Sequence, residues 1–512
     1  MASAHNEVAF VRTADAPVLP PPPNAIGVNG WLLQNLVSSW WVALVAGLFA
    51  YLAGTLIWDI VKWGIVDSVW VAENREGCLA PLAEGKPLGA CWAYVKAKLP
   101  QWIYGTYPID LRWRPAIVLL LFFALLIPLL IPRAPYKGLN AGLLFIAFPI
   151  VSLYLLYGTP IPHAGLGFAI WLVSTLFWFV GSLVAAVGFI FDTVLAFLNA
   201  GSAFSTVMSY AAFPFRWISE ALDALLGLAT ARLGIPAVFW LDYLLTSALV
   251  LGFLAARPAA QTPGWRGSLV KGAITIVAIG VFIRLVNIDE GLIVVDTGEW
   301  GGLLVTLIVA VTGIVASLPI GIMLALGRRS KMPAVRLLSV AFIELVRGVP
   351  LLTVLFMASV MLPLFLPAGT NFNKLLRALI GVALFSSAYM AEVVRGGLQA
   401  IPRGQYEAAQ ALGLSYWKMM GLIVLPQALR IVIPGIVNSF ISLFKDTTLV
   451  SIVGIFDLLG IVQVGFVDQK WVSAATPPTA YFAVAAIYWA FCFSMSRYSL
   501  YMERRLATGY RR

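Results

Sequence analysis

Long apolar runs constrain the fold of this chain more than any other feature of its sequence. Residues 115–132, for example, contain no charged side chain and, apart from prolines, are aliphatic or aromatic. About 20 consecutive apolar residues form a helix long enough to cross the hydrocarbon core of a bilayer. Of the 512 residues, 61% are hydrophobic and 11% are charged, whereas about 25% are charged in a typical soluble domain. The sequence therefore predicts an all-α integral membrane protein with many spans.

The apolar runs predict about twelve spans. They lie near residues 34–57, 115–132, 139–157, 166–190, 192–213, 237–256, 271–288, 301–326, 338–366, 377–395, 428–450 and 478–497. Residues 214–236 are amphipathic instead, a pattern that is typical of a helix lying along the membrane surface.

The net charge of +11 is compatible with a nucleic-acid partner or with the charge asymmetry of a membrane protein. The Lys and Arg residues fall mainly in short loops, namely Arg133–Lys137, Arg257–Lys271, Arg328–Arg336, Arg395–Lys418 and the tail from Arg497. An even count of about twelve spans places these loops and the N-terminus on one side. The positive-inside rule then predicts that both termini are cytoplasmic. We expect membrane lipid around the protein and no nucleic-acid partner.

The sequence carries no recognisable catalytic or metal motif. There is no G-x-x-x-x-G-K-[ST] loop to bind phosphates, and no nucleophile elbow or catalytic triad pattern. His5 and His163 are the only histidines, and no Cys/His cluster has metal-ligand spacing. We therefore expect no enzyme activity, no metal and no cofactor in this chain.

The segment EAAQALGLSYWKMMGLIVLP, residues 407–426, has the most specific pattern. Pro402 suits the first turn of a helix, and Gly413 suits the left-handed position just after a helix end. Ser415 can cap a second helix, and Pro426 marks the far end of that helix. The segment is therefore predicted to form two short helices with a break between them.

Ala408, Ala409 and Ala411 give the first of these helices a face of low bulk, which can lie close against another protein. The spacing resembles the EAA loop of importer-type ABC transporter permeases: EAA, three residues, Gly, nine residues, Ile, one residue and Leu-Pro. The resemblance implies a cytoplasmic coupling helix that docks into a groove on a separate ATPase subunit, which binds ATP and Mg. An ordinary turn between two spans is the alternative. The coupling residues implied are Glu407, Ala408, Ala409, Gly413 and Leu414.

Longer segments extend the resemblance. IELVRGVPLLTVLFMASVMLPLF at 343–365 and NSFISLFKDTTLVSIVGIFDLLG at 438–460 resemble the polar amino acid branch of these permeases. NLVSSWW at 35–41 and GACWAYVKAKL at 89–99 resemble the general L-amino acid subgroup. The chain departs from that pattern between about 160 and 290, which is longer than expected, and we expect these added helices to be peripheral.

The resemblance implies a function and a set of partners. The chain would be the permease subunit of an ATP-driven importer in the bacterial inner membrane. It would carry glutamate, glutamine, aspartate and asparagine, or a broader range of polar L-amino acids. The implied partners are ABC ATPase subunits, a second and different permease chain, and a periplasmic amino acid-binding protein.

The predicted regions follow from the spans and the resemblance. They are a cytoplasmic tail, 1–33; an N-terminal membrane region, 34–159, with a periplasmic loop, 58–114; additional membrane helices, 160–297; a permease domain, 298–500, with its coupling loop, 396–427; and a basic cytoplasmic tail, 501–512. The resemblance implies that the permease domain has the five-helix core of an ABC type I importer. The first tail contains the run Pro20–Pro23 and is either disordered or a docking peptide; its composition is not that of a cleavable signal peptide.

Two pairs of ionisable residues lie inside predicted spans. Glu344 and Arg347 are one turn apart, as are Glu392 and Arg395. Charges at membrane depth are costly unless they are paired. Pairing within or between the helices is one interpretation, and a role in the substrate path or the cytoplasmic gate is the other.

Lys445 and Asp446 lie where FKDTT interrupts an apolar helix. A broken helix with a charge pair suits a ligand that carries a carboxylate and an amine. Asn438 and Ser442 lie one turn apart on the same helix and can offer neutral hydrogen bonds. These four residues are candidates for the substrate path, and polar contacts between helices are the alternative.

Cys78 and Cys91 fall in the predicted periplasmic loop. That compartment is oxidising, so a disulfide is allowed, and two free thiols are the alternative. We interpret Cys492, in the last span, as a small apolar packing residue.

Two other classes of membrane protein fit the sequence less well. A secondary transporter or channel should have corresponding halves with interrupted helices or buried carboxylates for ion coupling, and the sequence has no convincing internal repeat. A structural scaffold would not need the EAA pattern. The permease interpretation is therefore favoured.

Overall fold

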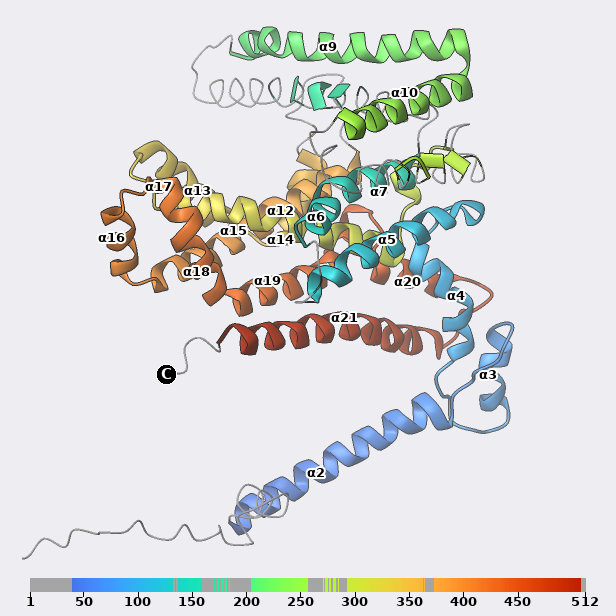
Figure 1. Ribbon diagram of the computed structural model, residues 1–512. Helices are drawn as coiled ribbons and strands as arrows, with labels where there is room; N and C mark the ends of the chain where they lie inside the picture. The colour runs from blue at the N-terminus through green and yellow to red at the C-terminus, as the bar shows by residue number, and fades with distance from the viewer. Residues whose placement is uncertain are drawn as a thin grey trace, which may run out of the picture. The chain divides into compact units, whose positions relative to one another are not determined.

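The computed structural model describes residues 39–131, 134, 137–158, 204–256, 292–361, 363 and 373–507, with single positions inside 170–184 and 270–284. These residues are overwhelmingly helical and contain three isolated β-bridges but no strand. The predicted all-α class is confirmed. The chain forms two compact units, Met1–Tyr94 with Ser473–Thr479, and Val95–Val472 with Ala480–Arg512, whose helices are labelled in Figure 1.

The first unit begins its described part with one long apolar helix. This helix consists of α2 (Trp40–Val61) and a π-helical turn, η2 (Lys62–Val66). It is long and apolar enough to cross a membrane, and no residue of α2 is buried. Lipid or another helix must therefore cover its apolar side chains. A short helix, α3 (Arg75–Ala83), follows, with the Asn74 side chain accepting from the Gly77 N–H.

Helix α4 (Trp92–Tyr104) leads into the second unit, whose N-terminal part is a small helical hairpin. Its elements are η3 (Ile109–Leu111), α5 (Trp113–Leu130), α6 (Lys137–Gly142), η4 (Leu143–Ala147) and α7 (Phe148–Tyr157). The Tyr107 hydroxyl donates to the Leu156 carbonyl at 2.9 Å, and the buried Arg114 donates to the Ile293 carbonyl at 2.7 Å. The first bond joins the start of the hairpin to α7, and the second fixes the hairpin to the segment that precedes the C-terminal helices.

Helices α9 (Phe204–Leu233) and α10 (Ile235–Ala256) meet at Gly234, which has a φ of +82°. Residues 204–213, predicted as the end of a span, and 214–233, predicted to lie on the membrane surface, form one continuous helix. The boundary predicted between them is wrong, since the helix continues through Pro214. The predicted spans 166–190 and 271–288 lie largely outside the described residues.

The C-terminal part holds the remaining elements. They are η7 (Thr297–Glu299), α12 (Gly302–Arg328), α13 (Pro333–Gly348), α14 (Leu351–Phe356), η8 (Met357–Met361), α15 (Lys374–Ala400), α16 (Arg403–Ala411), α17 (Tyr416–Met419), η10 (Met420–Val424), α18 (Leu425–Ile431), α19 (Ile433–Asp446), η11 (Thr447–Val453), α20 (Leu458–Val464), η12 (Gly465–Val467) and α21 (Thr476–Ala507).

Helices α12 and α15 form the centre of this part. Small residues let their backbones approach closely: a Cβ on Gly321 would lie 2.7 Å from the Met390 Cβ, and one on Gly313 would lie 3.0 Å from a Val382 methyl. Buried apolar side chains pack in one cluster near the N-terminal ends of both helices and in another near their C-terminal ends. The two helices therefore pack against each other, with a separate apolar cluster at each end.

The described part of the predicted span 338–366 is not one straight helix. Helix α13 ends at Gly348, and α14 with η8 leaves it at an angle of 107°. Val349 is extended, with φ −111° and ψ 138°, because the ring of Pro350 disfavours the helical conformation in the residue before it.

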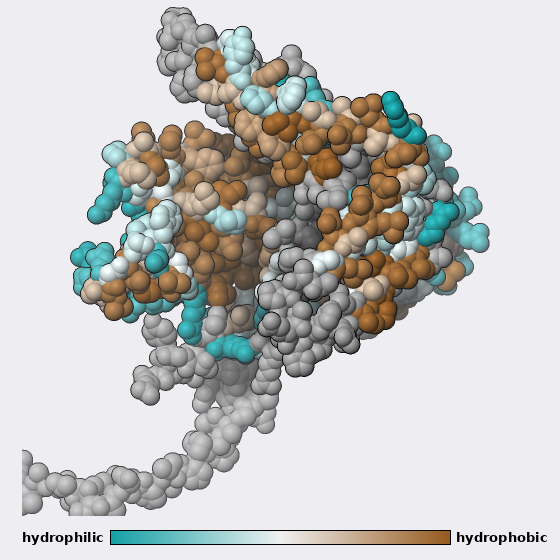
Figure 2. All heavy atoms as spheres, turned by 45° about the horizontal axis from the view of Figure 1, so that its top comes forward, coloured by the Kyte–Doolittle hydropathy of each residue, from teal (hydrophilic) through white to brown (hydrophobic). Residues whose placement is uncertain are grey.

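The predicted count of about twelve spans is not confirmed. Among the described residues, six helices are long and apolar enough to cross a membrane, or up to eight if each bent pair is one span. Figure 2 shows apolar side chains over wide areas of one face of the molecule. Such areas are typical of a surface that meets lipid or a partner.

Candidate functional site

The predicted coupling segment folds as two short helices, α16 and α17, with a turn between them. Pro402 precedes the first residue of α16, and Ser415 that of α17. Gly413 has a φ of +70°, the left-handed conformation expected after a helix end. Pro426 does not end the second helix, because the helical path continues through the π-helical turn η10 and Pro426 lies in the first turn of α18.

The exposed side of α16 differs from the predicted alanine face. Glu407, Ala408 and Ala411 are exposed, whereas Ala409 is 1% exposed and packs in the C-terminal apolar cluster. Leu414 is half-buried and packs against the same cluster. The exposed face of low bulk therefore consists of Ala408 and Ala411. Ala409 lies on the opposite side of α16 and packs against the rest of the protein.

Arg329, which the sequence analysis missed, ties α16 to the ends of α12 and α15. Its guanidinium donates to the Tyr406 hydroxyl at 3.0 Å and to the Leu398 carbonyl at 3.2 Å, and lies 5.4 Å from the centre of the Tyr406 ring. A cavity of about 430 Å³ opens beside these groups, with Glu407 and Arg403 in its lining. Arg329 therefore contacts both α16 and the C-terminal part of α15 from the end of α12.

The two predicted charge pairs come together, with Arg328 as a fifth member. Arg328 at the end of α12 lies 2.9 Å from the Glu344 carboxylate and 2.8 Å from that of Glu392. Glu392 also accepts from Arg395 at 2.7 Å and lies 3.8 Å from Arg347. Glu392 and Arg395 therefore pair within α15, and Arg347 approaches Glu392 between helices; the sequence analysis allowed both forms of pairing. We name these five residues the charge cluster.

The charge cluster joins the ends of three helices, α12, α13 and α15. It carries three guanidinium groups and two carboxylates, and the Glu392 side chain is 15% exposed. The only hint of Arg328 in the sequence was its place in a basic loop. Its pairing across helices depends on tertiary packing, which sequence spacing does not reveal.

The substrate-path candidates lie on α19. Asn438, Ser442 and Lys445 are exposed, and their spacing of four and three residues places them on one helix face. Asp446 is half-buried and is the last residue of α19, where the chain tightens into η11. The opposite side of α19 buries Leu443 and Phe444, so the polar face is turned away from the core.

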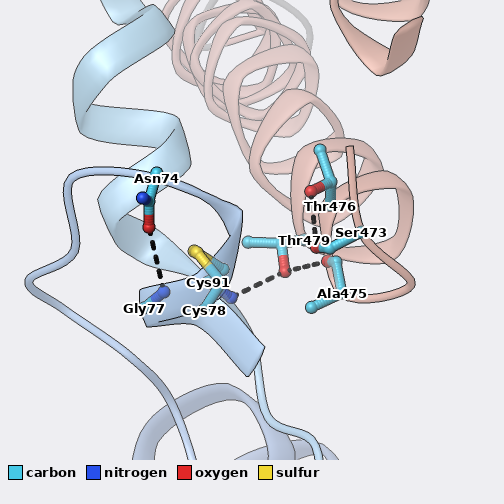
Figure 3. The surroundings of a disulfide bond; sticks show 8 residues. All are labelled: Asn74, Gly77, Cys78, Cys91, Ser473, Ala475, Thr476 and Thr479. Carbon is cyan, nitrogen blue, oxygen red and sulfur yellow. Dashed lines mark hydrogen bonds between the residues drawn. A yellow bond between two sulfur atoms is a disulfide. The ribbon is translucent and has the colours of Figure 1, made fainter. Parts of the chain in front are cut away.

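Cys78 and Cys91 are joined in a disulfide, with their Cα atoms 5.6 Å apart. Figure 3 shows the Cys91 N–H donating to the Thr479 hydroxyl, at 3.0 Å, beside the start of α21. The predicted loop 58–114 thus contains helices α3 and α4 and a covalent cross-link. Cys492 is a free, half-buried thiol in α21.

The sequence matches a known family and relatives along most of its length. Residues 317–508 match the family of binding-protein-dependent transport system inner membrane components. The inner membrane amino-acid ABC transporter permease protein YhdY of Escherichia coli is 37% identical over 94% of this chain and 93% of its own. The glutamate/glutamine/aspartate/asparagine transport system permease protein BztC of Rhodobacter capsulatus is 38% identical over 99% of this chain and 100% of its own.

A solved structure described as an amino acid ABC transporter with histidines aligns with 40% of this chain and 92% of its own, at 30% identity and a TM-score of 0.36. Both full-length relatives extend across the N-terminal part of the chain as well as its C-terminal domain. By this near-complete coverage at well over 30% identity, the chain belongs to the amino-acid ABC transporter permeases, multi-pass proteins of the bacterial inner membrane.

Proposed function

We propose that the chain carries polar L-amino acids into the cytoplasm, driven by separate ATPase subunits that dock on α16. The relative BztC is named for glutamate, glutamine, aspartate and asparagine, and we assign this substrate class to the present chain. ATP and Mg bind to the ATPase partner. A periplasmic binding protein delivers the amino acid to the opposite end of the helices.

The observation that carries the proposal is the position of α16. It presents Glu407 and Ala408 to solvent, and Arg329 holds it against the ends of α12 and α15. An exposed carboxylate can pair with a basic group on a partner. A helix that is open on one side and tied to two spans on the other is suited to pass on a movement of the ATPase.

The polar face of α19 supports a substrate path between two permease chains. Asn438, Ser442 and Lys445 are exposed on a helix that is apolar enough to span the membrane. Polar groups on a span are costly against lipid and usually face a partner or water. We therefore propose that a second, homologous permease chain faces α19 and that these residues, with Asp446 at the end of the helix, line the path between the two chains.

The orientation follows from the basic loops. Arg328, Arg329, Arg395 and Arg403 lie near the end of the helices that carries α16, and the positive-inside rule puts that end in the cytoplasm. Both termini are then cytoplasmic, and Cys78 and Cys91 are periplasmic. The added helices between 160 and 290 are peripheral in this proposal and contribute no ligand contact.

Purification of the native complex, followed by intact-mass analysis and reconstitution into vesicles, tests the proposal. We expect this chain, a second permease chain and two copies of an ATPase subunit, with glutamate uptake that requires ATP and the binding protein. Uptake without ATP, or a complex that contains no ATPase, would contradict it. Labelling of an Arg329→Cys variant from the periplasm would overturn the orientation.

A further inference from the structure

Apolar side chains stay exposed where the chain leaves α2, the long apolar helix of the first unit. Four of them are between 57% and 89% exposed, namely Ile65, Val66, Trp70 and Val71. Residues 73–76, with the sequence ENRE, follow closely and are exposed as well. An exposed apolar patch marks a contact with lipid or with a partner, and the geometry of the loop distinguishes the two.

The length of α2 sets the depth of its two ends in a membrane. Its 22 residues span about 33 Å at 1.5 Å per residue, which is close to the thickness of the hydrocarbon core, roughly 30 Å. Trp40 and Trp41 lie in its first turn and Trp58 lies in its last turn, and all three are exposed. Tryptophan is enriched at both interfaces of a membrane, because its ring is apolar and its N–H is polar. The end of α2 therefore lies at the level of the lipid headgroups.

The loop that carries the patch folds back against this end of the helix. The Trp92 indole N–H donates to the Gly64 carbonyl, in the π-helical turn η2, at 2.7 Å. The Trp70 ring stacks on the Trp92 ring, with their centroids 5.7 Å apart and an angle of 21° between their planes. Trp70 is thus held close to η2, at the end of the spanning helix, and Val71 follows it directly.

The disulfide holds the same loop from its other side. Cys91 directly precedes Trp92, and an isolated β-bridge pairs Cys91 with Val69, next to Trp70. The bond from Cys91 to Cys78 joins this pair to α3, and both cysteines are at most 1% exposed. The bridge and the covalent bond therefore order the residues on both sides of the stacked rings. An apolar side chain that is already ordered loses less entropy when it binds a surface.

From these observations we propose that Trp70 and Val71 insert into the interface of the lipid bilayer and anchor the disulfide-bonded loop there. The patch continues the exposed apolar surface of α2 and ends where the charged residues 73–76 begin. Apolar, aromatic and charged side chains thus succeed one another along the chain as they do across a membrane interface.

The inference goes beyond the proposed function and does not depend on which side of the membrane the loop faces. Part of the segment predicted as a free periplasmic loop, 58–114, then lies in the boundary between lipid and water. Trp70 and Val71 are covered by lipid in this arrangement, so a binding protein that docks on the permease does not contact them.

Spin labels at two positions test the depth of the loop in vesicles that contain the complete complex. The background is Cys492→Ser, which removes the free thiol. Val71→Cys carries the label in the patch, and Glu84→Cys carries it at an exposed charged position just after α3. Power-saturation EPR measures how often each label collides with oxygen, which concentrates in lipid, and with a neutral nickel chelate, which stays in water. Phospholipids labelled at the headgroup and along the acyl chain supply the depth scale.

We expect the label at Val71 to collide with the nickel chelate several-fold less often, and with oxygen more often, than the label at Glu84. Adding Trp70→Ser to the Val71→Cys chain should shift the collision ratio toward that of Glu84, because the indole no longer holds the loop in the interface. Equal ratios at Val71 and Glu84 would overturn the proposal. Few collisions with either reagent at Val71 would also overturn it and assign the patch to a partner protein. A ratio that Trp70→Ser leaves unchanged would refute the anchoring role of Trp70.

Discussion

The two ends of the α12–α15 pair differ in how their polar groups are satisfied. At the C-terminal end, Arg328 contacts both carboxylates of the charge cluster, and Glu392 contacts three arginines. At the N-terminal end, Trp300 and Arg377 keep buried N–H groups without acceptors. Paired charges stabilise a fixed arrangement, whereas a buried donor without an acceptor is a cost to stability. The C-terminal end is therefore held together by ion pairs that the N-terminal end lacks among these residues.

The largest effect is expected for Glu392→Ala, which would leave three guanidinium groups without their shared carboxylate. Breaking a buried pair from one side costs about 3 kcal/mol. The folded yield, measured by size-exclusion chromatography of a fluorescent fusion, should fall severely. Glu503→Ala, which removes an exposed carboxylate near the end of α21, should leave the yield unchanged. A Glu392→Ala variant that folds normally but shifts ligand preference would show that the cluster is a ligand site instead.

Gly321→Ala should have the next largest effect, because Gly321 lies where α12 packs closely against α15. The added Cβ would lie 2.7 Å from the Met390 Cβ and 3.1 Å from the Ala391 backbone nitrogen. Overpacking of this kind costs about 1–3 kcal/mol. The matched control is Gly396→Ala on α15, where a Cβ meets nothing within 4 Å. Thermal unfolding in detergent should separate the two variants, and equal midpoints would contradict the close contact.

A smaller effect is expected at the turn after α16. Gly413 and Gly404 both have open space around an added Cβ, but only Gly413 has a positive φ. Alanine at Gly413 should therefore cost about 1 kcal/mol through backbone strain, whereas alanine at Gly404 should be neutral or slightly stabilising because of its helix propensity. Thermal unfolding of the two variants checks this. A larger loss for Gly404→Ala would mean that the turn is not held in the left-handed conformation.

The smallest effect concerns a satisfied charge pair in the second unit. Lys98 lies 2.5 Å from Asp468 and lowers the pKa of that carboxyl below its usual 3.8, with help from the Lys470 N–H. Because the pKa is lowered in the folded state, the stabilisation is complete above pH 3.8 and is lost as pH falls through the folded pKa. Both side chains are partly exposed, so Asp468→Asn should cost under about 1 kcal/mol at pH 7.

The pH dependence of the difference in stability between the wild type and Asp468→Asn distinguishes an ion pair from packing. The wild type and Asp468→Asn should converge in unfolding midpoint as the pH is lowered to 3 and below. A difference between the two proteins that is independent of pH would mean that the contact is packing rather than an ion pair.

The sequence predicted local features better than tertiary ones. The membrane class follows from apolar runs. The start of α16 follows from Pro402 and the break after it from Gly413, because the backbone preferences of Pro and Gly act within a few residues. Arg328 and Arg329 escaped notice because their partners, Glu392 and Tyr406, lie far away in the chain. Trp300 looked like an ordinary apolar residue, since a missing acceptor is visible only after folding. The break at Pro350 was missed because the apolar run continues through it.

The most direct test of the account is the ratio of ATP hydrolysed to amino acid imported, in vesicles containing the complete complex. The variants are Gly413→Val and Glu407→Lys, with Gly404→Val as the control that adds the same bulk to α16 without a positive φ. The account predicts that Gly413→Val hydrolyses ATP with little uptake or loses its ATPase, that Glu407→Lys releases the ATPase, and that Gly404→Val keeps more of its coupling than Gly413→Val. A wild-type ratio and full retention of the ATPase in both Gly413→Val and Glu407→Lys would contradict the claim that α16 is the coupling element.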